Sequence, residues 1–131
     1  MNLNFQYAHH SRDESETRSG ISLSDALTAF DEFDWSEEIE KSNNLKKCSP
    51  TLSVIINGNH EMVWVSGYGN PDTPEFVSEC YFPGEVKKWF GLTKGQGTVN
   101  LSTQTFTKDQ ARKAIELLIA KNYRGLRELY A

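Results

Sequence analysis

Long hydrophobic runs are absent from this sequence of 131 residues. A helix that spans a membrane needs roughly 20 predominantly apolar residues, and no stretch approaches that length. The first ten residues also lack the basic segment and following apolar segment of a secretory signal. We therefore expect a soluble protein that resides in the cytoplasm and has no membrane partner.

Cysteine is almost absent as well, with only Cys48 and Cys80 in the chain. Neither has a second cysteine or a histidine at the spacing that metal ligands require. The Cys-x-x-Cys and His-x-Glu pattern of the zinc deaminases is missing too. We expect two free thiols in a reducing compartment, and neither a metal nor a cofactor.

Histidine is scarce, and the three that are present form no catalytic pattern. His9 and His10 lie in a polar segment and have no metal-binding partner three or four residues further on. His60 precedes Glu61, which could imitate an acid–base pair, although an exposed histidine in a turn is the simpler interpretation. Gly95-Gln96-Gly97 lacks the glycine spacing and the Lys-Ser/Thr of a phosphate-binding loop. The sequence therefore predicts a protein that is not an enzyme.

Basic residues are too few for a nucleic-acid-binding surface. The chain has 14 Lys and Arg against 18 Asp and Glu, and its net charge at pH 7 is -4. Because neutralisation of phosphates needs a basic surface, we expect no nucleic-acid partner. The imbalance is largest in one stretch without any Lys or Arg, whose acids are Asp25, Asp31, Glu32, Asp34, Glu37, Glu38 and Glu40.

Alternation of apolar and polar residues predicts strands. It is clearest from Asn2 to Tyr7. A β-branched run at 51–56 is followed by Asn57-Gly58, a strong hairpin signal, and by a return strand at 61–65. Further strands are predicted at 75–82 and 98–103. The segments between them predict a flexible polar loop at 9–20, a wide loop at 66–74, and an irregular connection at 85–97 in which Trp89, Phe90 and Leu92 cover one end of the core.

Two capping patterns predict helices. Ser22 with Asp25 begins the first helix, at 22–33, and Thr107 with Gln110 begins the second, at 107–121. Hairpin-connected strands need no crossover, so the sheet should be largely antiparallel with the helices on one face. We predict a single α+β domain, residues 1–131, with four to five strands and two main helices.

Trp35 stands among the acids at the end of the first helical stripe. An exposed aromatic side chain surrounded by carboxylates is a plausible hot spot for a basic protein partner. Two plainer interpretations stay open: the acids form the solvated face of an amphipathic helix, and Trp35 belongs to the core.

From Thr51 onward the sequence resembles a known family. The resemblance lies in Leu52-Ser53-Val54-Ile55-Ile56, Met62-Val63-Trp64-Val65, Gly67-Tyr68-Gly69-Asn70, and the helix opening Phe106-Thr107-Lys108-Asp109-Gln110-Ala111-Arg112-Lys113-Ala114. These segments are similar to the first-numbered family of immunity proteins of bacterial polymorphic toxin systems. The resemblance implies a non-enzymatic inhibitor that binds a cognate toxin domain, often a nuclease or a nucleic-acid deaminase.

The resemblance also implies a reason for the acidity, because an acidic inhibitor can occupy the basic cleft of such a toxin. The alternatives are an adaptor or chaperone that binds a secreted effector or peptide, and, less favoured, a small hydrolase that uses His60 and Glu61. The predicted toxin-binding residues are Asp31, Glu32, Asp34, Trp35, Glu37, Glu38, Tyr68, Asn70 and Asp72.

Overall fold

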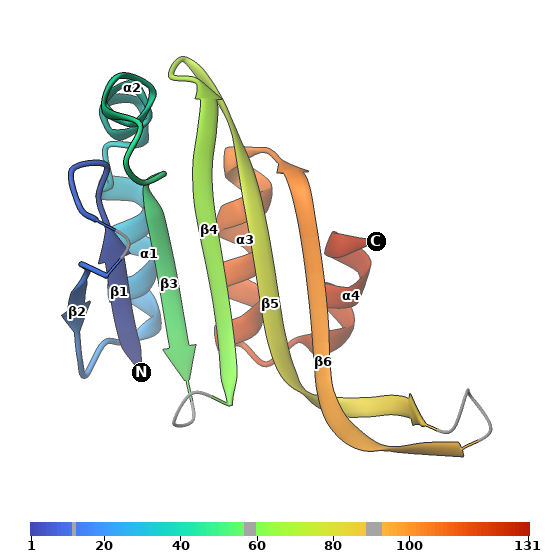
Figure 1. Ribbon diagram of the computed structural model, residues 1–131. Coiled ribbons are helices and arrows are strands. Elements are labelled where there is room, and N and C mark those ends of the chain that lie inside the picture. The colour runs from blue at the N-terminus through green and yellow to red at the C-terminus, as the bar shows by residue number, and fades with distance from the viewer. Residues whose placement is uncertain (12, 57–59, 89–92) are drawn as a thin grey trace.

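The computed structural model describes residues 1–11, 13–56, 60–88 and 93–131, and gives only the backbone of 85–88, 93, 94 and 96. These ranges form six strands and four helices (Figure 1). The predicted α+β class and antiparallel sheet are confirmed. The predicted counts of four to five strands and two main helices are too low.

One antiparallel sheet runs through the described chain in the order β2-β1-β3-β4-β5-β6. Its strands are β1 (Asn2–Gln6), β2 (Glu16–Arg18), β3 (Thr51–Ile56), β4 (Glu61–Asn70), β5 (Thr73–Lys88) and β6 (Thr93–Phe106). The helices are α1 (Leu23–Glu32), α2 (Trp35–Leu45), α3 (Lys108–Ile119) and α4 (Tyr123–Tyr130). Helices α1, α3 and α4 lie behind the sheet in Figure 1, and α2 lies at the end where β3 begins.

Burial alternates along the strands, and this alternation identifies the covered face. Leu3, Val54, Val63 and Cys80 lie opposite one another on neighbouring strands, and all four are buried beneath the helices. The residues between them point to the other side of the sheet. We call that side the uncovered face, because none of the four described helices packs on it (Figure 1).

The polar segment after β1 is more ordered than the sequence suggests. A flexible loop was expected over 9–20, but Glu16–Arg18 pairs with β1 as an edge strand. The Gln6 side-chain amide donates to the carbonyls of Ser11 and Glu14, and the Arg18 guanidinium lies 4.5 Å from the centre of the Phe5 ring. Polar contacts therefore order this segment, and its sequence has no apolar periodicity from which a strand could be predicted.

Two glycine-containing segments expected to be irregular are instead strands. The pairing of β4 with β5 continues to Asn70 opposite Thr73, so the wide loop expected at 66–74 is a tight turn. An irregular connection was expected at 85–97, but the pairing of β5 with β6 continues through 85–88 and 93–97 and forms an arm that leaves the sheet (Figure 1). The expectations for Asn57-Gly58 and for Trp89, Phe90 and Leu92 concern residues outside the described ranges.

The two predicted capping boxes are present. The hydroxyl of Ser22 accepts from the Asp25 amide, and the Asp25 carboxylate accepts in return from the Ser22 amide; Thr107 and Gln110 do the same for α3. Helices α2 and α4 were not predicted. Helix α2 buries only two apolar side chains, so its helical period is faint in the sequence. Helix α4 is short, but it does carry an apolar stripe at helical spacing, which was a signal for it: Tyr123, Leu126, Leu129 and Tyr130.

Trp35 is part of the core. Only 2% of it is exposed, and its indole N–H donates to the carbonyl of Phe30 at 3.1 Å. The ring packs against those of Phe33, Phe30 and Phe76, with centroids 4.2, 5.4 and 5.0 Å away. The expectation that Trp35 is an exposed anchor is therefore wrong, because the start of α2 turns the indole inward.

Replacing Trp35 by alanine should destabilise the fold rather than create a simple binding defect. The change removes a large buried ring and a buried hydrogen bond, at a cost of about 3–5 kcal/mol in the free energy of unfolding. Urea unfolding of Trp35→Ala beside Ser36→Ala, an exposed neighbour on the same helix, measures this loss. A midpoint unchanged from the parent would contradict the assignment of Trp35 to the core.

Candidate functional site

Asp31 is exposed, but its charge is paired. Its carboxylate accepts two hydrogen bonds from the Arg112 guanidinium, at 2.8 and 3.0 Å, which links α1 to α3. This hydrogen bonding holds the pKa of Asp31 below its ordinary value. The sequence could not show that a cation 81 positions away neutralises one of the acids.

Glu38 contradicts the expectation that every acid in this stretch lies on the surface. It is 8% exposed, and it accepts a hydrogen bond from the Ala8 amide at 3.0 Å and another from Lys41. Burial of a carboxylate is tolerated when its oxygens are hydrogen-bonded in this way. Glu38 therefore links α2 to the chain that follows β1. Because it is buried, it is unsuited to contact a partner.

The remaining predicted acids are exposed. Asp34 caps α2 by accepting from the Glu37 amide, and Glu37 pairs with Lys41 at 3.1 Å. Glu32 has no ion-pair partner among the described residues. It borders a small hollow together with Asp34, Phe33 and Tyr7. These acids give the α1–α2 junction a negative surface, although a weaker one than the sequence implies.

Tyr68, Asn70 and Asp72 occupy a different part of the molecule. Asn70 and Asp72 form the exposed turn between β4 and β5, where the Asp72 amide donates to the Asn70 side chain at 2.9 Å. Tyr68 lies on the uncovered face, and its hydroxyl approaches the Glu75 carboxylate at 2.9 Å. That hydrogen bond raises the pKa of Tyr68. The nine predicted residues thus do not form one surface.

The uncovered face carries a group of partly exposed apolar and aromatic side chains in its centre. Trp64 lies between Ser53 on β3 and Glu79 on β5. Its indole N–H has no partner among the described residues, in contrast to that of Trp35. The apolar group around it, which we call the central patch, consists of Ile55, Met62, Trp64, Val77 and Tyr81.

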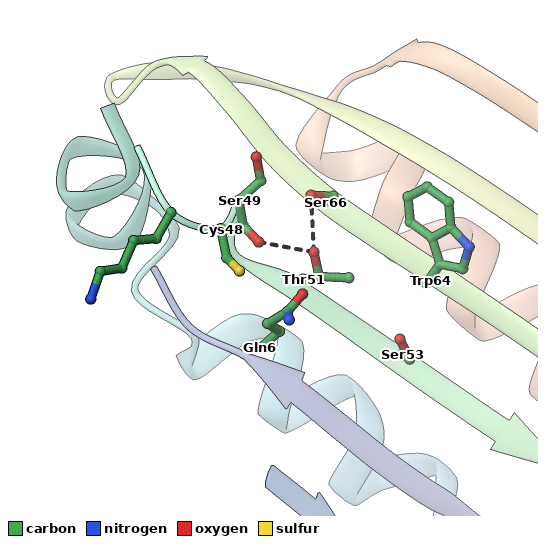
Figure 2. Close-up of a pocket in the computed structure, with 8 residues that line it drawn as sticks. Gln6, Cys48, Ser49, Thr51, Ser53, Trp64 and Ser66 are labelled. Atoms are coloured by element: carbon green, nitrogen blue, oxygen red, sulfur yellow. Dashed lines mark hydrogen bonds between the residues drawn. The ribbon is translucent and has the colours of Figure 1, made fainter. Parts of the chain in front are cut away.

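A shallow hollow of about 480 Å³ adjoins Trp64 at the end of the sheet where β3 begins (Figure 2). Hydroxyl groups dominate its lining, and the Thr51 hydroxyl lies 3.0 Å from both the Ser49 carbonyl and the Ser66 hydroxyl. Figure 2 shows Cys48 and Trp64 at opposite ends of it. We call this hollow the Trp64 hollow. The residues that line it are Gln6, Lys47, Cys48, Ser49, Thr51, Ser53, Trp64 and Ser66.

The charged side chains on the uncovered face of the sheet are acidic. Glu75 and Glu79 lie on β5, and Glu79 accepts a hydrogen bond from Asn100 on β6 at 3.1 Å. Within the described part of the six-stranded sheet, excluding the arm, the strands place no Lys or Arg on this face. Lys47 stands at the edge of the Trp64 hollow.

The possible acid–base pair at the start of β4 is not assembled. Glu61 is 1% exposed on the helix side, where its carboxylate accepts from Lys121 at 2.9 Å and from the Tyr123 hydroxyl. These contacts raise the pKa of Lys121, and burial together with Glu61 raises that of Tyr123. His60 is exposed. Glu61 therefore joins β4 to the α3–α4 connection.

No metal-binding group of three or more His, Cys, Asp or Glu side chains is found among the described residues. In the same ranges, no helix has the length and apolar character needed to cross a membrane. Comparison of the chain with protein-family models, with curated proteins and with solved structures finds no match.

The two cysteines, both free as predicted, differ in their surroundings. Cys80 is fully buried beneath α4, and desolvation raises its pKa to about 11, so roughly one thiol in a thousand is ionised at pH 8. Cys48 retains 9% exposure and borders the Trp64 hollow (Figure 2). Only Cys48 offers a chemical probe of the uncovered face.

We expect iodoacetamide at pH 8 to alkylate Cys48 of the folded protein much faster than Cys80, by about tenfold or more. Alkylation requires a thiol that is both accessible and ionised, and the thiol of Cys80 is buried and has a raised pKa. Peptide mass spectrometry after timed labelling measures the two rates. Unfolding in urea is the control and should make them similar; faster labelling of Cys80 in the folded protein would contradict its burial.

Proposed function

We propose that this protein is an immunity protein, which acts in the cytoplasm of the producing bacterium by binding a cognate toxin domain. The toxin would be one that acts on nucleic acid, a nuclease or a deaminase, and its basic cleft would be occluded. The observation that carries the proposal is the uncovered face, where an acidic protein leaves Trp64, Tyr81 and their apolar neighbours without a covering helix. Contiguous exposed apolar patches of this kind mark interaction sites.

Electrostatics supports the same class of partner. A toxin that acts on nucleic acid has a basic cleft, and a protein with net charge -4 is attracted to it over distance. Exposed Glu32 and Asp34 concentrate this charge at the α1–α2 junction, beside exposed Glu37, which pairs with Lys41. The motifs that resemble the immunity family add to the case, since that family inhibits toxins of this type.

The direct test is co-expression with the toxin-domain product of the adjoining open reading frame. We expect the two proteins to co-purify as a stable complex, and we expect cells that carry both genes to survive when the toxin alone kills them. A toxin domain inactivated at its catalytic residue should bind equally well. Failure to bind any adjoining gene product, with both proteins folded, would contradict the proposal.

Reversing Glu32 and Glu37 to lysine should slow association with the toxin by about three- to tenfold at low salt and flatten its salt dependence. The dissociation rate should change little, because these acids act mainly during encounter. The matched control reverses Glu116 on α3, which is partly exposed, and Glu128 on α4, which is exposed, with the same change in net charge. Stopped-flow kinetics compares association of the toxin domain with the two double variants. Equal slowing by both variants would show that only the total charge matters.

A further inference from the structure

We infer that the partner docks on the uncovered face, with Trp64 as its anchor, and that the partner surface presents lysine or arginine side chains around an apolar patch. This inference rests on the proposed function and assigns the contact surface to β-strands rather than to the acidic α1–α2 junction. The central patch supplies the apolar contact, and the Trp64 hollow receives a side chain of the partner.

The uncovered face is large enough for a specific interface. Five spacings of about 4.8 Å across six strands, and six residues of about 3.3 Å along them, give a projected area on the order of 500 Å². Side-chain relief increases this value toward the roughly 800 Å² that each partner contributes to a standard interface. Helices α1, α3 and α4 lie on the other side of the sheet and α2 lies at its end, so none of the four described helices packs on this area (Figure 1).

Trp64 has the features of an anchor residue. It is partly exposed near the middle of the sheet, and Met62 and Tyr81 flank it in the next row, where the Tyr81 hydroxyl lies 3.6 Å from the Met62 sulfur. A partner that covers the indole would remove a large apolar surface from water and could accept a hydrogen bond from the free N–H. Tryptophans in such positions are enriched among the residues that dominate binding energy.

Charge distinguishes a basic partner from a second copy of this chain. Two uncovered faces brought together would oppose the carboxylates of Glu75 and Glu79 in both copies, on proteins that each carry a net charge of -4. A basic protein surface would pair those carboxylates instead. Polar side chains on β1 and β6 surround the central patch, as in interfaces that have an apolar core and a polar rim.

The test uses the inactivated toxin domain from the adjoining open reading frame as the probe. Trp64→Ala should raise its dissociation rate at least about 30-fold, which corresponds to the loss of a hot-spot side chain. Leu23→Ala is the matched control, because Leu23 is an apolar side chain 40% exposed on α1, on the covered side. Glu79→Lys should weaken binding at least about tenfold, whereas Glu128→Lys on α4 should not.

Alkylation of Cys48 provides a second readout on the unmodified protein. Binding of the toxin domain should slow its reaction with iodoacetamide about tenfold or more, because Cys48 borders the Trp64 hollow. If Trp64→Ala does not fold, as judged by its thermal midpoint, protection of Cys48 and the Glu79→Lys result decide the matter.

Normal binding by folded Trp64→Ala, with Cys48 still reactive in the complex, would overturn the docking face and leave the proposed function intact. Failure of the parent protein to bind the toxin domain would overturn both. Protection of Cys48 in the protein alone, increasing with its concentration, would show that a second copy covers this face and would also overturn the inference.

Discussion

The close approach of α2 to β4 is the constraint on which the rest of the structure depends. A Cβ atom at Gly67 would lie 3.0 Å from the Cδ1 atom of Ile39 and 3.2 Å from the Cε3 atom of Trp35, so any larger residue there would push these two side chains away from the sheet. Left-handed Lys46 then ends α2 and redirects the chain toward β3. The connection that follows carries Cys48 past the end of the sheet. The packing of Trp35 on one face thus shapes the hollow beside Trp64 on the other.

Coverage of only one face explains the distribution of apolar residues. On the helix side, apolar side chains extend across the sheet from Leu3 on β1 to Val99 on β6. On the uncovered face, among the described residues of the sheet, the apolar side chains lie on β3, β4 and β5. The flanking strands β1 and β6 place polar residues there, such as Asn4 and Asn100. A solvated face of an antiparallel sheet is mainly polar, and a core face is mainly apolar. The mixed pattern on the uncovered face is the one that the proposed docking requires.

Strand alternation and helix caps could be predicted from the sequence because they are local signals. Alternation along a strand also implies that Met62 and Trp64 share a face, but no local pattern reveals which face the helices cover. Trp35 could not be assigned for the same reason: its burial depends on Phe76, far along the chain. Helix α2 has a faint period, whereas α4 is only eight residues long although its apolar stripe is clear. The tight turn after Asn70 was hidden by glycine and proline residues that normally indicate loops.

The proposed binding separates two roles that the acidic stretch was expected to combine. Pairing of Asp31 with Arg112 and burial of Glu38 remove two charges from its outward field, and Trp35 is withdrawn from its surface. Screening at physiological salt limits the remaining field to about 8 Å, which is enough to orient an approaching basic protein but not to hold it. Retention requires desolvated apolar contact, which Trp64 and the central patch can supply. In the proposed complex, attraction and retention would therefore reside in different secondary-structure elements.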